Sequence, residues 1–299
     1  RDTDRSRGLG DVYKRQGYQY EDSVIYGFTH TNKGHWNLCH IPLLPVTGTP
    51  TPGDYCSPFS HERESAAPGY YQVFLDRYGV DAQLSSTLRC AFHKYTYPAG
   101  AAPAVLADLQ RSNEHVRAWD IRKEGDNVFA GWQQTGEKMY FYAVANRPVT
   151  GIEPVVEGDR EVRIVRFGEG DGALELRIGF SFVSEKNARE NLEAEMLGKS
   201  FAEVRSEATA TWNDLLGRIR VEGGTEREKG LFYSSLYRSF LWPALRSDVN
   251  GEFTDVDGKV INPGFRYYTG PSYWDDYRNK LILLGMLAPD VAADVISSD

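Results

Sequence analysis

The first part of the chain, from Glu21 to about Phe182, alternates between apolar and polar residues with a period of two. The segments with this character are short and rich in aromatic and β-branched residues: Tyr70–Leu75, Ala82–Leu88, Met139–Val144, Arg160–Phe167 and Ala173–Phe180. A period of two places one face of a strand in the core and the other in water. Because turn signals rich in Gly and Asp separate these segments, the pattern predicts an antiparallel β-sandwich.

The period becomes helical at Ser184. This serine is a suitable N-cap with an acidic residue after it, and apolar residues then recur at helical spacing as far as Leu216, interrupted only by Gly198. A second helix is predicted from about Thr225 to Leu241, before Pro243.

Two turns and a third helix are predicted in the last part of the chain. Asp248–Gly251 has the composition of a turn, and Asp255–Gly258 that of a hairpin. The third helix should begin near Tyr273 and run through Leu287, because Pro289 stops it.

These patterns divide the sequence into four segments. Residues 1–16 are dense in charge, lack the apolar run of a signal peptide and are interpreted as a non-native tail. Residues 17–183 form the predicted sandwich, and residues 184–221 form a helical linker. Residues 222–299 are predicted to be all-α and resemble the start of a larger helical domain.

Composition excludes several classes of protein. With 41% apolar and 25% charged residues among 299, the chain can form a packed core. The net charge of −8 argues against a nucleic-acid-binding protein, and no run of 18 apolar residues predicts a membrane span. The three cysteines, Cys39, Cys56 and Cys90, have the spacing of neither a disulfide framework nor a metal knuckle.

The densest cluster of unusual residues spans 26–45 and contains His30, His35 and His40. The five-residue steps between these histidines fit no zinc motif. A loop with Trp36 and Asn37 suits sugar recognition, because an indole offers a flat apolar face and an amide offers directional hydrogen bonds. The alternative, which composition alone favours, is a packed loop between strands.

A second cluster lies at 272–278, where Trp274, Asp275 and Arg278 crowd the start of a predicted helix. Asp275 and Arg278 are three residues apart and can share a helix face, either as a surface ion pair or as part of a site. In a third cluster, His61, Glu62 and Glu64 have the chemistry of acid–base residues, but the nearby Pro68-Gly69 turn favours a role in loop capping.

Six groups of residues, in order along the chain, resemble glycoside hydrolase family 92, the calcium-dependent exo-α-mannosidases of bacteria. The groups are Gly27–His30 with Ile41–Pro45, Phe59–Glu62 with Ala67–Tyr71, Leu84–Arg89, Phe180–Ser184 with Asn191–Glu195, Phe232–Arg238, and Trp274–Arg278. The sequence departs from the family's usual pattern at two places that bear on the substrate. The loop Gly34–Cys39 differs from the commoner Gly-Thr-Gly type, and Asp276 stands where the family usually has Thr.

The resemblance implies a β-sandwich followed by the first helices of a truncated (α/α)6 barrel, with the site between them. It implies inverting hydrolysis of α-mannosides of N-glycans or mannans, with calcium in the intact enzyme, and a periplasmic or secreted location. In the family, the catalytic acid, the base and most calcium ligands fall later in the barrel, so no residue of this chain is assigned to catalysis or to a metal. The predicted substrate contacts are Asp275 and Arg278 as hydroxyl partners and Trp274 as a wall, followed by His30, Trp36 and Asn37.

Two other functions remain open. The first is a non-catalytic carbohydrate-binding sandwich with a helical appendage, which the helices after Ser184 disfavour. The second is an amidase acting on N-glycan asparagine, which needs a nucleophilic cysteine near a histidine. Cys39 beside His40 is the only pair of that kind adjacent in the sequence.

Overall fold

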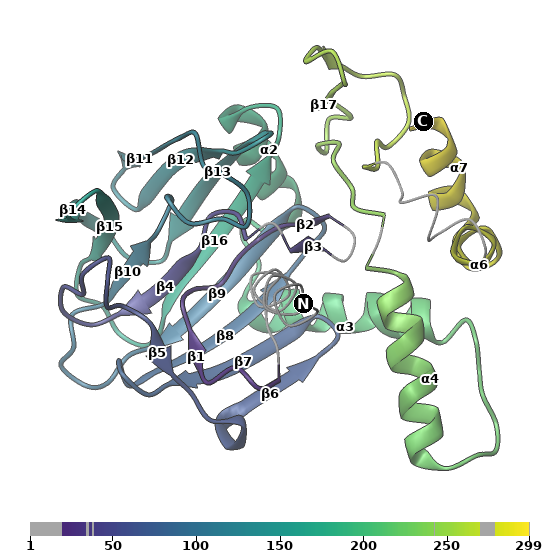
Figure 1. The fold of residues 1–299 in the computed structure, drawn as a ribbon, viewed down its shortest axis with the longest axis horizontal. Helices are drawn as coiled ribbons and strands as arrows, with labels where there is room; N and C mark the ends of the chain where they lie inside the picture. The colour runs from purple at the N-terminus through teal and green to yellow at the C-terminus, as the bar shows by residue number, and fades with distance from the viewer. Residues whose placement is uncertain (1–19, 34–35, 38, 242, 270–278, 299) are drawn as a thin grey trace, which may run out of the picture.

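The computed structural model describes residues 20–33, 36–37, 39–241, 243–269 and 279–298 (Figure 1). The predicted tail and residues 274, 275 and 278 lie outside these ranges. The described part consists of an antiparallel β-sandwich followed by helices, as the sequence predicts. No helix among these residues is long and apolar enough to cross a membrane.

The larger sheet of the sandwich has eight strands. In spatial order they are β11 (Ala118–Gly125), β12 (Val128–Gln134), β13 (Lys138–Ala145), β16 (Leu174–Ser181), β9 (Cys90–Thr96), β8 (Val80–Ser86), β7 (Tyr70–Leu75) and β6 (Glu64–Ala67). Burial alternates residue by residue along β13, as the period of two predicts.

The smaller sheet contains β14 (Val149–Glu157), β15 (Arg160–Phe167), β10 (Ala104–Ala107) and β4 (Leu43–Val46). Every residue of β10 and of its neighbour β4, at the edge of this sheet, is buried, so these two strands carry no alternation of apolar and polar residues. Two short pairs complete this part: β1 (Val24–Ile25) with β5 (Ser57–Pro58), and β2 (Asn32–Lys33) with β3 (Trp36–Asn37).

Two helices cover the outer face of the larger sheet. The predicted helix after Ser184 is divided in two, α2 (Glu185–Glu195) and α3 (Phe201–Leu216), on either side of Gly198, whose φ of 89° suits glycine. A close approach at Gly179 lets α2 lie on β16, because a Cβ there would overlap the carbonyl oxygen of Ala188. Seven buried residues form the resulting second core: Tyr70, Cys90, Phe92, Leu192, Met196, Phe201 and Val204.

The remaining elements stand to one side of the sandwich in Figure 1. They are α4 (Glu226–Ser239), the hairpin of β17 (Phe253–Thr254) and β18 (Val260–Ile261), α6 (Lys280–Leu287) and α7 (Pro289–Ser297). The hairpin and the end of α6 agree with the prediction. The helix α7 was not predicted, although Pro289 at its first turn is a common helix start.

Candidate functional site at the junction

Asp248 fastens the segment after α4 to the sandwich. Its side chain is 3% exposed, and it accepts hydrogen bonds from Ser181 Oγ at 2.6 Å, Asn187 Nδ2 at 2.9 Å and Asn191 Nδ2 at 2.6 Å. Burial raises the pKa of this carboxyl group, and the hydrogen bonds oppose that rise. Ser181 ends β16 and the two asparagines belong to α2, so one carboxylate ties three elements together.

A second contact strengthens the same attachment. Arg89 donates from Nε to the carbonyl oxygen of Ser247 at 2.7 Å, and its Nη1 lies 2.6 Å from Glu195 Oε1. Sequence analysis predicted Asp248–Gly251 as a turn, which is correct, because Gly251 N–H bonds to the Asp248 carbonyl. The anchoring role of the Asp248 side chain was missed, since its partners are 57 to 67 residues away in the sequence.

Arg246 carries a buried positive charge at the junction. Its guanidinium lies over the ring of Phe182, 4.1 Å from the centroid, and its Nε is 3.9 Å from Glu137 Oε2 in the turn between β12 and β13. Burial lowers the pKa of this side chain. Within the described part of the chain, its Nε and Nη2 have no hydrogen-bond acceptor.

His40 links the sandwich loops on the other side of this charge. Its ring lies 2.7 Å from Thr31 Oγ1 and 3.0 Å from Thr135 Oγ1, and Thr135 donates its hydroxyl proton to Glu114 Oε2 at 2.6 Å. His40 Nε2–H must therefore donate to Thr135, and Nδ1 accepts from Thr31. The pKa of His40 is lowered to about 4: burial is the largest cause, Glu114 opposes it, and the charge of Arg246 acts in the same direction as burial. The ring is therefore neutral at pH 7.

His30, a predicted substrate contact, is half-buried and bonds within the sandwich. Its Nδ1 donates to the Ile41 carbonyl at 2.8 Å, so its Nε2 accepts from His93 Nε2 at 3.1 Å, while Tyr95 donates to His93 Nδ1 at 2.6 Å. Burial lowers the pKa of His30 to about 4 and that of His93 well below its usual range. Both ring nitrogens of His30 are thus hydrogen-bonded to other groups of the protein. Its contact with a sugar stays a prediction.

The loop with Trp36 and Asn37 forms the β2–β3 hairpin, whose backbone pairs Lys33 with Trp36 and Asn32 with Asn37. The backbone bond from His30 N–H to the His40 carbonyl, at 3.2 Å, closes the base of this hairpin. The network of His40 therefore lies directly below the predicted sugar-binding loop. Sequence reasoning missed this role of His40, and the only signal was the density of histidines around it.

The third cluster is structural, as predicted. Residues His61–Arg63 form a single 3₁₀ turn capped by Ser60, and His61 Nδ1 lies 2.6 Å from Glu64 Oε2. Among the described residues, no three His, Cys, Asp or Glu side chains gather as metal ligands.

Comparison with known proteins places these features in a family. The model described as Glycosyl hydrolase family 92 N-terminal domain matches residues 2–191, and the family's catalytic domain matches residues 187–299. A family GH92 α-mannosidase from Bacteroides thetaiotaomicron superposes with a TM-score of 0.87 at 26% identity, over 95% of this chain and 43% of that one.

Two further relatives agree with this match. A family GH92 inverting mannosidase from the same organism superposes with a TM-score of 0.82 at 26% identity, over 94% of this chain and 41% of that one. An uncharacterized secreted glycosidase from Arthroderma benhamiae is 24% identical over 84% of this chain and 38% of its own length. The chain thus spans about two fifths of the relatives that it matches, and it belongs to glycosyl hydrolase family 92.

Proposed function

We propose that the intact protein is an exo-acting α-mannosidase that hydrolyses α-mannosides of N-glycans or mannans with inversion of configuration. The observation that carries the proposal is the match over almost the whole chain to mannosidases at 26% identity, one of them described as inverting. A related structure holds mannoimidazole, which is a mannose-like ligand of that enzyme.

Inversion requires a carboxylic acid that protonates the leaving oxygen and a carboxylate that activates water, roughly 6.5–9.5 Å apart. We assign neither role to a residue of this chain. Its contribution is to bind and orient the sugar, with Trp274 as a wall, Asp275 and Arg278 as hydroxyl partners, and His30, Trp36 and Asn37 as further contacts. The Asp248 anchor supports this arrangement, because it holds the start of the segment that leads to Asp275 against the sandwich.

Calcium belongs to the proposal only as a cofactor of the intact enzyme. Bound to sugar hydroxyls, it would supply positive charge that polarises them. Among the described residues, no three His, Cys, Asp or Glu side chains gather that could hold it. Export from the cell is part of the same proposal, and the relative named as a secreted glycosidase supports it.

The amidase alternative finds no support in the geometry around Cys39. Burial raises the pKa of this thiol, whereas a nucleophilic cysteine needs a lowered pKa. The ring nitrogens of the neighbouring His40 already bond to Thr31 and Thr135. The alternative of a non-catalytic carbohydrate-binding sandwich does not explain why residues 187–299 match the family's catalytic domain.

The test is hydrolysis of an aryl α-mannoside by the intact protein, followed by NMR of the first sugar formed. The expected product is β-mannose, which then mutarotates. Release of α-mannose would refute inversion, and the absence of hydrolysis with and without added calcium would refute the proposal. The 299-residue chain alone should show no turnover, because it spans about two fifths of its relatives' length and the family's acid and base fall later in the barrel.

A second test concerns Asp275. Losing a charged hydrogen-bond partner of a sugar costs about 1.5–3 kcal/mol, so Asp275→Ala in the intact protein should lower kcat/KM at least about tenfold with little change in Tm. Asp276→Ala is the matched control and should keep its activity, because the family usually has Thr there. Full activity of Asp275→Ala, or a loss of stability alone, would make Asp275 a structural residue.

A further inference from the structure

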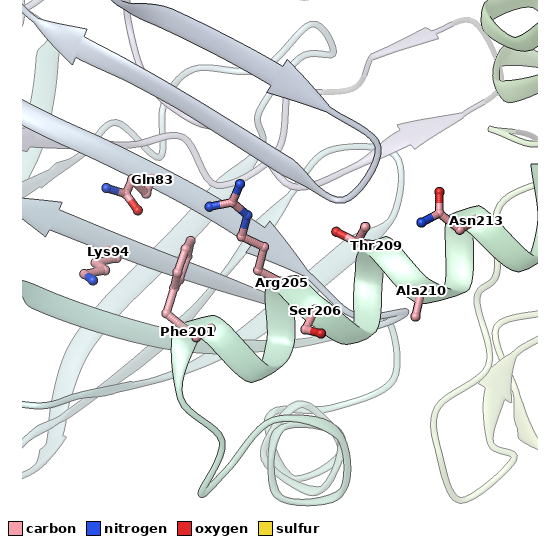
Figure 2. A pocket seen from close by; sticks show the side chains of 9 residues that line it. Gln83, Lys94, Phe201, Arg205, Ser206, Thr209, Ala210 and Asn213 are labelled. Atoms are coloured by element: carbon pink, nitrogen blue, oxygen red, sulfur yellow. The ribbon is translucent and has the colours of Figure 1, made fainter.

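A groove lies between α3 and the outer face of the larger sheet, and none of the junction residues lines it (Figure 2). It has a volume of about 710 Å³ and is open to solvent. Its floor includes Gln83 and Lys94, which are paired in register on β8 and β9. Its wall is one face of α3.

Two positive charges line this groove without a negative partner. No acidic side chain is among its lining residues, and within the described residues neither Lys94 nor Arg205 lies within ion-pair distance of a carboxylate. Each instead rests on an aromatic ring: Arg205 Cζ is 3.7 Å from the centroid of Tyr70, and Lys94 Nζ is 5.7 Å from that of Phe201. Both charges are therefore held in place while their N–H groups can serve a ligand.

The acidic residues around the groove are engaged elsewhere. Asp81 accepts hydrogen bonds from Gln72 at 2.8 Å and from Gln83 at 2.9 Å. Glu175, opposite Lys94 on β16, pairs with Arg177 at 3.1 Å. On α3, Glu207 pairs with Lys199 and Glu203 bonds to Ser200 in the helix cap. Asp81 weakens the local positive potential, but none of these carboxylates neutralises Lys94 or Arg205 directly.

Polar side chains that can bind hydroxyl groups extend the positively charged region. Thr209 and Asn213 follow Arg205 at intervals of four residues and lie on the same side of α3, as Figure 2 shows. Both are exposed, and Asn213 offers both an amide donor and a carbonyl acceptor. The groove thus combines two cations, amides, a hydroxyl and the ring of Phe201.

We propose that this groove binds an acidic oligosaccharide, one that carries carboxylate, sulfate or phosphate groups, at a position separate from the predicted mannoside site. The cations would bind the anionic groups, and the amides and the hydroxyl would bind the sugar hydroxyls. A volume near 700 Å³ falls within the range of small-ligand sites. The net charge of −8 repels anions from the protein as a whole, so binding would depend on this local pair. The choice of a saccharide rests on the proposed function.

The experiment is titration calorimetry of the intact protein with α-1,4-trigalacturonate at low salt, with its methyl ester as the neutral counterpart. We expect saturable binding of the acid, weakened at least about tenfold by 0.3 M NaCl, and no saturable binding of the ester. Arg205→Gln and Lys94→Gln should each weaken binding about tenfold. Lys186→Gln on α2, equally a loss of one positive charge but outside the groove, should change it less than twofold.

The outcomes separate this proposal from the proposed function. Activity on an aryl α-mannoside should be the same in the Arg205→Gln variant and the parent, because Arg205 is not part of the proposed mannoside site. Equal binding of the acid and the ester, unchanged binding in both groove variants, or no binding by a protein that is active on the mannoside would each overturn the groove proposal alone.

Discussion

The sandwich and the helices after α3 differ sharply in how they bury their apolar residues. The sandwich has one continuous core drawn from both sheets, in which the rings of Phe129, Phe141 and Phe167 meet edge to face. The helical part has a small cluster whose fully buried members are Tyr268, Leu284 and Val295. Its helices also expose large apolar side chains, namely Leu231, Ile282, Met286 and Ile296.

The difference teaches where stability resides in this chain. A sheet pair can bury both of its inner faces within itself, whereas an isolated helix pair can cover only one stripe of each helix. We therefore expect the sandwich to unfold cooperatively and the helices after α3 to be held weakly. Limited proteolysis should cut first after about Leu216, and preferential cleavage within the sandwich would contradict this division.

The largest effect is expected from a substitution in the main core. Phe129 is fully buried, so Phe129→Ala should lower the free energy of unfolding by about 3–5 kcal/mol. Leu284→Ala, in the helical cluster, should leave the urea midpoint of the sandwich unchanged. Urea titration followed by near-UV circular dichroism measures both. A shift of the sandwich midpoint by Leu284→Ala as large as that by Phe129→Ala would show that the two parts unfold as one.

The next effect tests the attachment between the two parts. Asp248→Ala removes the acceptor of three hydrogen bonds, from Ser181, Asn187 and Asn191, at a cost of about 1–3 kcal/mol. Asn187 keeps its bond to Glu252 and Asn191 its bond to the Phe180 carbonyl, so the Ser181 hydroxyl loses most. We expect faster hydrogen exchange in α2 and in residues 246–254, with the smaller sheet unchanged. The control is Asp257→Ala in the exposed hairpin turn, which should change hydrogen exchange neither in α2 nor in residues 246–254. Unchanged exchange in α2 would mean that the anchor does not hold the parts together.

The histidines should make the stability of the sandwich sensitive to acid, because all six lie between His30 and His115. The pKa values of His30 and His40 are lowered to about 4, whereas an unfolded histidine titrates near 6.5. The stability from their neutral forms is complete above pH 6.5 and is lost as the pH falls towards 4. The free energy of unfolding should fall by up to about 1.4 kcal/mol per pH unit for each of them.

His40→Gln tests this pH dependence, since it should make the slope of unfolding free energy between pH 6.5 and 4.5 shallower. His115→Gln, at an exposed position outside this network, offers the matched control for the substitution itself. An equal slope in the His40→Gln variant and the parent would show that carboxylates alone account for the acid response.

The smallest effects are expected from substitutions at two equivalent helix caps. Ser200 caps α3, which packs on the sandwich, and Thr225 caps α4, and both take part in capping boxes. Each substitution by Ala should cost its helix about 1 kcal/mol. Ser200→Ala should lower the Tm of the sandwich, whereas Thr225→Ala should affect only the helicity of α4. Equal shifts of the sandwich Tm would contradict the separation.

Much of the fold was predictable because local patterns record it. The strands β7 and β15 occupy the predicted residues, and the N-cap at Ser184 and the hairpin around Asp255–Gly258 were correct. The predictions failed where local signals are absent or ambiguous. The strands β4 and β10 are buried on both faces and show no alternation, and the helical period alone did not show the break at Gly198.

The sequence identified segments of the candidate site, but not the contacts that their side chains make. The sequence alone determined that histidines and aromatic residues concentrate around residues 26–45, that a β part precedes an α part, and that six motifs follow the order of a mannosidase family. Only the tertiary structure decided that both ring nitrogens of His30 bond within the sandwich, that His40 supports the hairpin and that Asp248 anchors the junction. The physical reason is sequence distance: the partners of these side chains lie as far as 95 residues away, and a hydrogen bond between such residues leaves no periodic trace in the chain.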